Sequence, residues 1–261
     1  MIIDVAAKIN TSLKITGIKD GMHTIVSTMQ SIDLYDTLCV ESSDVDMIIT
    51  DIAVENNTII KALNAFRNAY GAKCVNVTVK KRIPIGAGLG GSSADAAGML
   101  VALSVFNGIG IDRIIEDGVA LKVGSDVPFM IKGGCAVVKD TGNLIESVSE
   151  KSDDVYLIAV PNSFVSTRDA YKLYDEVGTY ADAVNDLTKA AKLLNEDIVK
   201  YEAALNKSKA DKVFMSGSGS AMVGVFKDVA TASEAARTLD KLSPRYVAVH
   251  KSVGSGIRVY G

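Results

Sequence analysis

Residues 84–93 read Pro-Ile-Gly-Ala-Gly-Leu-Gly-Gly-Ser-Ser, a run that carries four glycines. The run follows a half-buried strand predicted at residues 74–80, where valines alternate with polar residues, and it precedes a helix predicted at residues 94–106. Glycines let backbone N–H groups approach a phosphate closely, and the start of the helix adds the positive end of its dipole. The run therefore predicts an anion-binding loop, with Ser92 or Ser93 capping the helix.

Three kinds of glycine-rich loop have to be distinguished. A P-loop ends in Gly-Lys-Ser or Gly-Lys-Thr, but Gly91 is followed by Ser92, which excludes a Walker-type NTPase. Gly86, Gly88 and Gly91 satisfy the Gly-x-Gly-x-x-Gly pattern of dinucleotide folds. However, residues 81–84 separate the strand from the loop, and no strand-end acid follows about 20 residues later, which disfavours a dehydrogenase. A plain glycine turn before an ordinary helix is the remaining alternative, although ordering so many glycines without a ligand is costly.

Length and composition set wider limits. The chain has 261 residues, of which 48% are hydrophobic and 23% charged, so it can bury a full core, and disorder or a small disulfide scaffold is excluded. A net charge of −3 argues against nucleic-acid binding through bulk positive charge. The three cysteines, Cys39, Cys74 and Cys135, are far apart, which indicates reduced core thiols. Only two histidines occur, which disfavours a zinc site or a histidine-based hydrolase. No run approaches the ~18 apolar residues of a membrane span, so we expect a cytoplasmic protein with no membrane and no nucleic-acid partner.

Strand and helix patterns divide the chain into two α+β units. Residues 1–40 predict antiparallel strands, and a helix follows at residues 57–70. The polar residues 140–154 mark the boundary, which gives an N-terminal domain of residues 1–152 packed beside a C-terminal domain of residues 153–261. The other predicted elements are strands at 131–139, 155–160 and 246–251, a strand–turn–strand unit at 212–226, and helices at 167–176, 185–205 and 230–242.

Three segments together resemble the motifs of a known family. They are the glycine loop, Ala7-Lys8-Ile9-Asn10 near the N-terminus, and Met215-Ser216-Gly217-Ser218-Gly219-Ser220-Ala221 near the C-terminus. In this order they resemble the motifs of the GHMP kinases, which phosphorylate galactose, homoserine, mevalonate and related alcohols. The resemblance implies the two-domain GHMP kinase fold of the α+β class, with a ribosomal protein S5 domain 2-like N-terminal domain and a ferredoxin-like C-terminal domain. It also implies ATP and Mg²⁺ as cofactors.

Further segments resemble the family members that phosphorylate a cytidine diphosphate conjugate of methylerythritol in non-mevalonate isoprenoid biosynthesis. Three positions depart from their pattern: Met22 replaces a tyrosine, Ser92 a glycine and Ala94 a serine. Two alternatives stay open, a kinase of the homoserine or phosphomevalonate type, which Met22 would favour, and a non-catalytic nucleotide-binding protein of the same fold. The segments that carry the resemblance are Leu13, Ile15 and Gly17, then Gly21-Met22-His23, Ile32 to Leu38, Gly124 to Phe129, Val165 to Tyr171 and Asn185-Asp186-Leu187.

The resemblance assigns the chemistry to two charged residues. Asp126 would be the base that takes the proton of the substrate hydroxyl, and Lys8 the cation that orients it. Without the resemblance, Asp126 could merely begin a turn and Lys8 could lie at a strand edge. Asn57 would contact adenine, with a helix N-cap as an equal alternative. The loop residues that would bind ATP are Pro84, Gly86, Ala87, Gly88, Leu89, Gly90, Gly91, Ser92 and Ser93.

The substrate side is implied by the same resemblance. Asn10 and Tyr171 would help bind the methylerythritol and cytidine parts, and His23 would hydrogen-bond the cytosine. Ser218 and Gly219 would close the substrate side. The alternatives are a polar histidine in a hairpin turn and an ordinary hairpin at Ser218 and Gly219.

The expected partner is a small-molecule alcohol, and either a monomer or a homodimer is compatible with the sequence. Mg²⁺ bridges phosphate oxygens and prefers few protein ligands. The sequence therefore assigns no metal ligand, beyond the position of Ser93 at the end of the loop.

Overall fold

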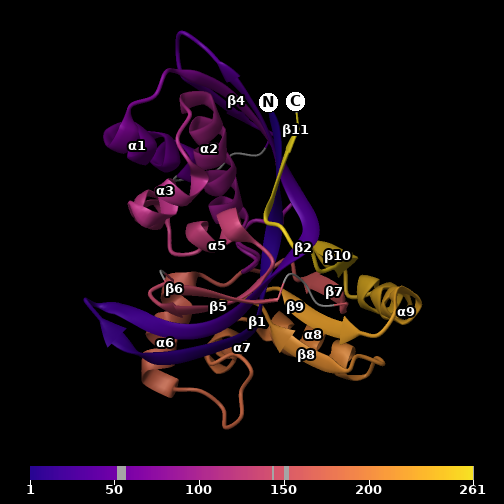
Figure 1. Cartoon of the computed structure of the whole chain (residues 1–261). Coiled ribbons are helices and arrows are strands. Elements are labelled where there is room, and N and C mark those ends of the chain that lie inside the picture. The colour runs from indigo at the N-terminus through magenta and orange to yellow at the C-terminus, as the bar shows by residue number, and fades with distance from the viewer. Residues whose placement is uncertain (52–56, 143, 150–152, 261) are drawn as a thin grey trace.

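The computed structural model describes residues 1–51, 57–142, 144–149 and 153–260, and its strands form two sheets (Figure 1). Within these residues the first sheet has seven strands, in the order β11-β1-β2-β4-β3, with β5 paired to β2 and β6 to β5. Only the pair of β3 and β4 is parallel there. The strands are β1 (Ile2–Lys19), β2 (Met22–Ser42), β3 (Met47–Thr50), β4 (Val75–Lys80), β5 (Cys135–Asp140), β6 (Leu144–Ser149) and β11 (Ile257–Tyr260).

β1 and β2 form a long hairpin that carries much of the candidate site. The prediction of antiparallel strands over residues 1–40 is confirmed, because Ile2 pairs with Cys39 and Lys19 with Met22. Asp20 and Gly21 make the turn, with φ of 52° and 77° in the left-handed region that Gly favours and Asp tolerates. Register shifts along the pair bend the strands. The tip of the hairpin lies beside α6 (Thr167–Val177) (Figure 1).

Five helices pack on one side of this hairpin (Figure 1). The central one is mostly apolar and is buried from Ala94 to Ser104, and the helix predicted there from its alanine- and leucine-rich sequence is confirmed. A Cβ at Gly98 would lie 2.7 Å from Val5 Cγ2, so this glycine allows the helix to approach β1 closely. The helices are α1 (Thr58–Tyr70), the central α2 (Gly91–Asn107), α3 (Ile111–Glu116), α4 (Val119–Val123) and α5 (Val127–Lys132).

The second sheet has the antiparallel order β10-β7-β9-β8. Its strands and the helices between them follow the β-α-β-β-α-β pattern of a ferredoxin-like fold, as expected, with two extra helices after the first. The elements are β7 (Val155–Val160), α6, α7 (Thr188–Leu194), α8 (Glu196–Asn206), β8 (Lys212–Met215), β9 (Met222–Phe226), α9 (Val229–Asp240) and β10 (Tyr246–Lys251).

The two sheets share part of their core through β7, which is buried at every residue. Tyr156, Ile158 and Val160 pack into the same hydrophobic cluster as the first sheet and its helices. Leu157 and Ala159 point the other way, into a second cluster with α6 to α9. Because side chains alternate along a strand, β7 joins the two halves of the molecule.

The predicted division after residue 152 stays a prediction, because residues 150–152 lie outside the described residues. β11, which belongs to the predicted C-terminal domain, pairs with β1 in the first sheet. None of the helices within the described ranges is long and apolar enough to cross a membrane.

Three local predictions were wrong. Residues 131 and 132 end helix α5 instead of starting a strand, and the strand begins at Cys135, after Gly133 ends the helix with φ of 69°. The helix predicted at residues 185–205 is two helices, because Asn195 is extended and its side chain caps α8 by accepting from the Asp197 N–H at 3.0 Å. The cysteines expected in the core, Cys39, Cys74 and Cys135, are half-buried.

Candidate functional site

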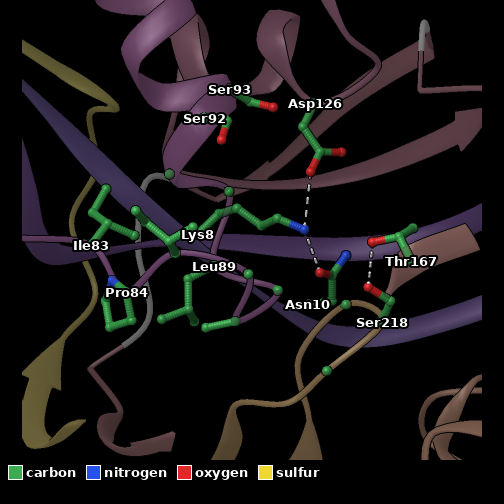
Figure 2. Close-up of a pocket in the computed structure, with 18 of the residues that line it drawn as sticks. Lys8, Asn10, Ile83, Pro84, Leu89, Ser92, Ser93, Asp126, Thr167 and Ser218 are labelled. Atoms are coloured by element: carbon green, nitrogen blue, oxygen red, sulfur yellow. Dashed lines mark hydrogen bonds and ion pairs between the residues drawn. The ribbon is translucent and has the colours of Figure 1, made fainter. Parts of the chain in front are cut away.

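The glycine loop forms one wall of a cavity of about 320 Å³ (Figure 2). The other walls come from β1 and β2, from the residues before α5, from the start of α6, and from the turn between β8 and β9. Segments that are far apart in the sequence thus bring fifteen of the seventeen predicted site residues to one place. The predicted site residues that line the cavity are Lys8, Asn10, Pro84, Gly86, Ala87, Gly88, Leu89, Gly90, Gly91, Ser92, Ser93, Asp126, Tyr171, Ser218 and Gly219.

Two of the seventeen predicted site residues, Asn57 and His23, do not line the cavity. Asn57 caps helix α1, since its Oδ1 accepts from the Ile59 N–H at 3.0 Å. The N-cap alternative is therefore the role that the structure shows for Asn57, and a contact with adenine stays a prediction.

The loop takes its shape from glycines in the left-handed region. Gly86, Gly88 and Gly90 have φ of 64°, 76° and 76°. Gly90 is the N-cap of α2, so the helix begins at Gly91 and no side chain caps it. The prediction that Ser92 or Ser93 caps the helix was wrong, because both lie inside its first turn and line the cavity instead.

Lys8 and Asp126 meet at the centre of the site (Figure 2). Their Nζ and Oδ2 atoms are 3.1 Å apart, and the Lys8 ammonium also donates to Asn10 Oδ1 at 2.6 Å. The Lys8 side chain is 6% exposed, whereas that of Asp126 is 25% exposed. The amide of Asn10 in turn donates to Ser27 Oγ at 2.7 Å. The arrangement leaves a carboxylate open to the cavity beside a buried cation, which is suited to accepting a proton from a bound hydroxyl.

The turn between β8 and β9 packs against the glycine loop and hydrogen-bonds to it. Ser216 Oγ accepts from the Asn10 N–H at 3.1 Å and donates to the Gly88 carbonyl at 2.9 Å. A Cβ at Gly88 would overlap the Ser216 carbonyl oxygen, so the two segments are in contact. At the edge of the cavity, Ser218 Oγ lies 2.8 Å from Thr167 Oγ1 at the start of α6 (Figure 2).

His23 does not line the cavity itself but contacts Tyr171, which does. The two rings lie 4.8 Å apart between centroids, and His23 Nε2 lies 2.7 Å from Asp175 Oδ1 on α6. Burial raises the pKa of the Tyr171 phenol to about 12, and the charge of Asp126 adds to the rise. Tyr171 is therefore a neutral ring between His23 and the Lys8–Asp126 pair.

Sequence reasoning missed a buried charge cluster beneath the loop, formed by Lys81, Asp36 and Asp95. The Lys81 ammonium bonds to both carboxylates, and Asp36 also accepts from the Ile83 N–H at 2.8 Å. Burial raises the pKa of Asp95 to about 7, although Lys81 opposes the rise. Burial alone would lower the pKa of Lys81, but the two aspartates outweigh it and raise that pKa. The sequence signal was weak, because only Asp36 and Asp95 lie near apolar residues while Lys81 follows Lys80, and no spacing rule pairs residues so far apart.

Family models and relatives agree on what these motifs are. The model of the GHMP kinases N terminal domain matches residues 57–134, and the GHMP kinases C terminal model matches residues 169–244. The protein of Thermodesulfovibrio yellowstonii named 4-diphosphocytidyl-2-C-methyl-D-erythritol kinase is 33% identical, over 88% of this chain and 90% of its own. A protein of the same name from Thermoanaerobacter pseudethanolicus is 33% identical, over 97% and 96% of the two chains.

Solved structures agree with the sequence relatives. A crystal structure of 4-(cytidine 5'-diphospho)-2C-methyl-D-erythritol kinase matches with a TM-score of 0.81 and 25% identity, over 96% of this chain and 99% of its own. Homoserine kinase from Cytophaga hutchinsonii shares the fold, with a TM-score of 0.74 and 15% identity over 100% and 97% of the chains. The expected two-domain α+β fold is confirmed. Since both family models and nearly full-length relatives match, the chain belongs to the GHMP kinases, a family of small-molecule kinases.

Proposed function

We propose that this chain transfers the γ-phosphoryl group of ATP to the 2-hydroxyl of 4-diphosphocytidyl-2-C-methyl-D-erythritol. The relatives that carry the name of this kinase cover 88% and 97% of the chain, which supports the choice of acceptor. The observation that carries the reaction is the Lys8–Asp126 pair, 3.1 Å apart and open to the cavity beside the glycine loop.

In this proposal the loop residues bind and orient the phosphates of ATP. Backbone N–H groups at the start of α2 would contact phosphate oxygens, favoured by the helix dipole. Asp126 takes the proton of the 2-hydroxyl as its oxygen attacks the γ-phosphorus, the bond from that phosphorus to the bridging oxygen breaks, and ADP leaves. Lys8 orients Asp126 and offsets the negative charge near the reacting oxygen.

Mg²⁺ would accompany ATP and neutralise charge on the phosphates. Among the described residues no group of three or more His, Cys, Asp or Glu side chains could hold a metal ion. Because Mg²⁺ prefers few protein ligands, in this proposal phosphate oxygens hold most of the ion. The Ser93 hydroxyl, which lines the cavity in the first turn of α2, would be its ligand from this chain.

The cytidine part of the acceptor would bind at the Tyr171 end of the cavity. Tyr171 offers a ring face for the cytosine, and His23 beside it offers a hydrogen bond to the base edge. Met22 is 57% exposed next to His23 and would supply an apolar contact in place of a tyrosine. Asn10 and the Ser218 segment would lie along the methylerythritol part.

We further propose that the enzyme acts in the cytoplasm on small molecules alone, as a monomer or a homodimer.

ADP release with a panel of alcohols tests the proposed reaction. We expect turnover with the cytidine diphosphate conjugate, and none above background with homoserine or a mevalonate phosphate. Preference for one of those alcohols would reassign the protein within its family. ATP binding with no ADP release from any alcohol would make it a nucleotide-binding protein without catalysis.

A further inference from the structure

Asn185 lies on the segment between α6 and α7 and is only 1% exposed. Its side-chain amide donates two hydrogen bonds, to the Met215 carbonyl at 2.9 Å and to the Gly217 carbonyl at 2.7 Å. Its Oδ1 accepts from the Leu187 N–H at 3.0 Å. Both amide hydrogens of Asn185 are thus used to hold the turn between β8 and β9.

The segment that carries Asn185 is itself attached to β1. The Leu13 N–H donates to the Val184 carbonyl at 3.0 Å, and the Asp186 N–H donates to the Leu13 carbonyl at 2.9 Å. Leu13 lies on the strand that carries Lys8 and Asn10. Asn185 therefore connects the strand of the catalytic pair to the turn behind the glycine loop.

That turn touches both halves of the site. Its Ser216 hydroxyl bonds to the Asn10 N–H and to the Gly88 carbonyl, as described above, and the Ala221 N–H donates to the Ala87 carbonyl at 3.1 Å. Small displacements of the turn would therefore change how the phosphate loop lies relative to Lys8 and Asp126.

We infer that Asn185 is a positioning residue for phosphoryl transfer, acting through Ser216 on the alignment of the loop with the Lys8–Asp126 pair. Without Asn185 two buried carbonyls lose their donors, and the turn would shift to recover partners. A misplacement of about 1 Å at a reacting centre can cost about 10²-fold in rate. The N–H groups that would bind ATP belong to the loop itself, so nucleotide affinity should change little.

Gln30 provides a matched control. It is also 1% exposed, and its amide donates to the carbonyls of Ser31, Gly134 and Val253 at 2.9, 3.2 and 3.3 Å. Gln30 pairs with Ile9, so its side chain lies on the face of the sheet opposite that of Lys8. Asn185→Ala and Gln30→Ala both remove a buried amide that holds main-chain carbonyls, but only the first acts on the turn.

The test measures kcat, KM for ATP and thermal unfolding of the two variants, with rates expressed per folded molecule. It uses the acceptor of the proposed function, on which this kinetic part rests. We expect both variants to lose stability, but only Asn185→Ala to lose about 10- to 100-fold in kcat, with KM for ATP within about threefold of the wild type. Equal kcat values for the two variants would overturn the inference.

Ser216→Ala is a second variant that removes only a hydroxyl and keeps Asn185. It should lower kcat in the same way, and the double variant should be little worse than either single variant, because both changes act on one alignment. Losses that multiply would show that the two residues act separately and would overturn the path through Ser216.

Amide hydrogen exchange gives a readout that needs no acceptor. Asn185→Ala should speed exchange in residues 215–221 and also in residues 86–90, whereas Gln30→Ala should leave both segments as in the wild type. Unchanged exchange in residues 86–90 of Asn185→Ala would overturn the inference whatever the substrate. A wild-type protein that fails to phosphorylate the conjugate would overturn only the proposed substrate.

Discussion

Asn10 shows how hydrogen bonds decide which atoms of the site are free. Its Oδ1 accepts from Lys8 and its Nδ2 donates to Ser27, so both polar atoms of its side chain already have hydrogen-bond partners within the protein. Lys8 is likewise occupied by Asn10 and Asp126. Asp126 keeps 25% of its side chain exposed, which is what the proposed role as base for the substrate hydroxyl requires.

Asp126→Asn keeps the size of the side chain and removes its capacity to take a proton. We expect kcat to fall by about 10² to 10⁴, with little change in ATP affinity, because the phosphate loop is untouched. Steady-state kinetics at saturating ATP and acceptor, with a separate ATP titration, provide the measurement. A variant with nearly wild-type kcat would remove Asp126 from the mechanism.

His23→Ala tests the acceptor side. The variant should bind the cytidine diphosphate conjugate more weakly by roughly 1 to 3 kcal/mol, the cost of losing one hydrogen-bond partner, since His23 lies beside the Tyr171 ring. Its ATP affinity is the internal control and should not change, because His23 does not line the cavity beside the glycine loop. Equal conjugate affinity in variant and wild type would show that the cytosine binds elsewhere.

At the scale of elements, the glycine loop is held by a neighbouring turn as well as by its own conformation. The sequence predicts that glycines are needed there so that phosphate can approach. The structure adds a different reason at Gly88, where a side chain would collide with the Ser216 carbonyl. The loop and the turn between β8 and β9 therefore behave as one unit.

Gly88→Ala and Gly118→Ala separate backbone strain from this contact. Both glycines have positive φ, 76° and 70°, but a Cβ at Gly118 would meet nothing within 4 Å. Each substitution should cost about 1 to 2 kcal/mol of stability through backbone strain. Only Gly88→Ala should also weaken ATP binding, by about tenfold or more, because the loop must move away from Ser216. Thermal unfolding and ATP titration of both variants check this, and equal ATP affinities would contradict the contact.

The elements that the sequence predicted well have a clear local pattern, either a short continuous apolar run or an alternation of apolar and polar residues. The strands at residues 155–160 and 246–251 have the predicted bounds, and valines alternate in β4 as expected. The break between the two helices at Asn195 was not predicted, because it depends on the extended backbone conformation of Asn195, which helical periodicity does not encode. β11 was missed because a four-residue strand becomes a strand only through its pairing with β1.

The residues of the candidate site also divide into those that local sequence patterns predicted and those that they did not. Contiguous motifs such as the glycine loop were found from residue type and order, and the structure brings them to one cavity. Asn185, Ser216 and the Lys81 cluster act through contacts between distant segments, such as the one from Asn10 to Ser216. Their roles follow from the tertiary structure, which periodicity and local propensity cannot specify.

At the scale of the whole molecule, the free energy of unfolding includes the cost of burying the Asp95 carboxylate between the first sheet and its helices. Asp95 has only 6% of its side chain exposed, and its Oδ1 has no hydrogen-bond partner among the described residues. Its pKa of about 7 lies above the 3.8 of an unperturbed aspartate, so the folded protein binds the proton more tightly than the unfolded chain does. The free energy of unfolding must therefore depend on pH through this group.

Asp95→Asn should remove that dependence. A carboxyl whose pKa is raised by folding contributes stability at low pH that is lost as pH rises through the folded pKa of about 7. The stability of the wild type relative to Asp95→Asn should therefore fall by about 2 to 3 kcal/mol between pH 5 and pH 8 and then level off. Urea unfolding of both proteins across this range measures the difference. A constant difference would mean that Asp95 is ionised throughout in the folded protein.

The pairing of β11 with β1 has a consequence for synthesis on the ribosome. β1 leaves the exit tunnel early, but its edge over residues 2–5 pairs with residues 257–260, which emerge only after the second sheet has been made. During that interval the nascent chain presents an open strand edge, a template on which another chain can pair. The first sheet is therefore completed late, and chaperone protection matters most in the time between translation of β1 and translation of β11.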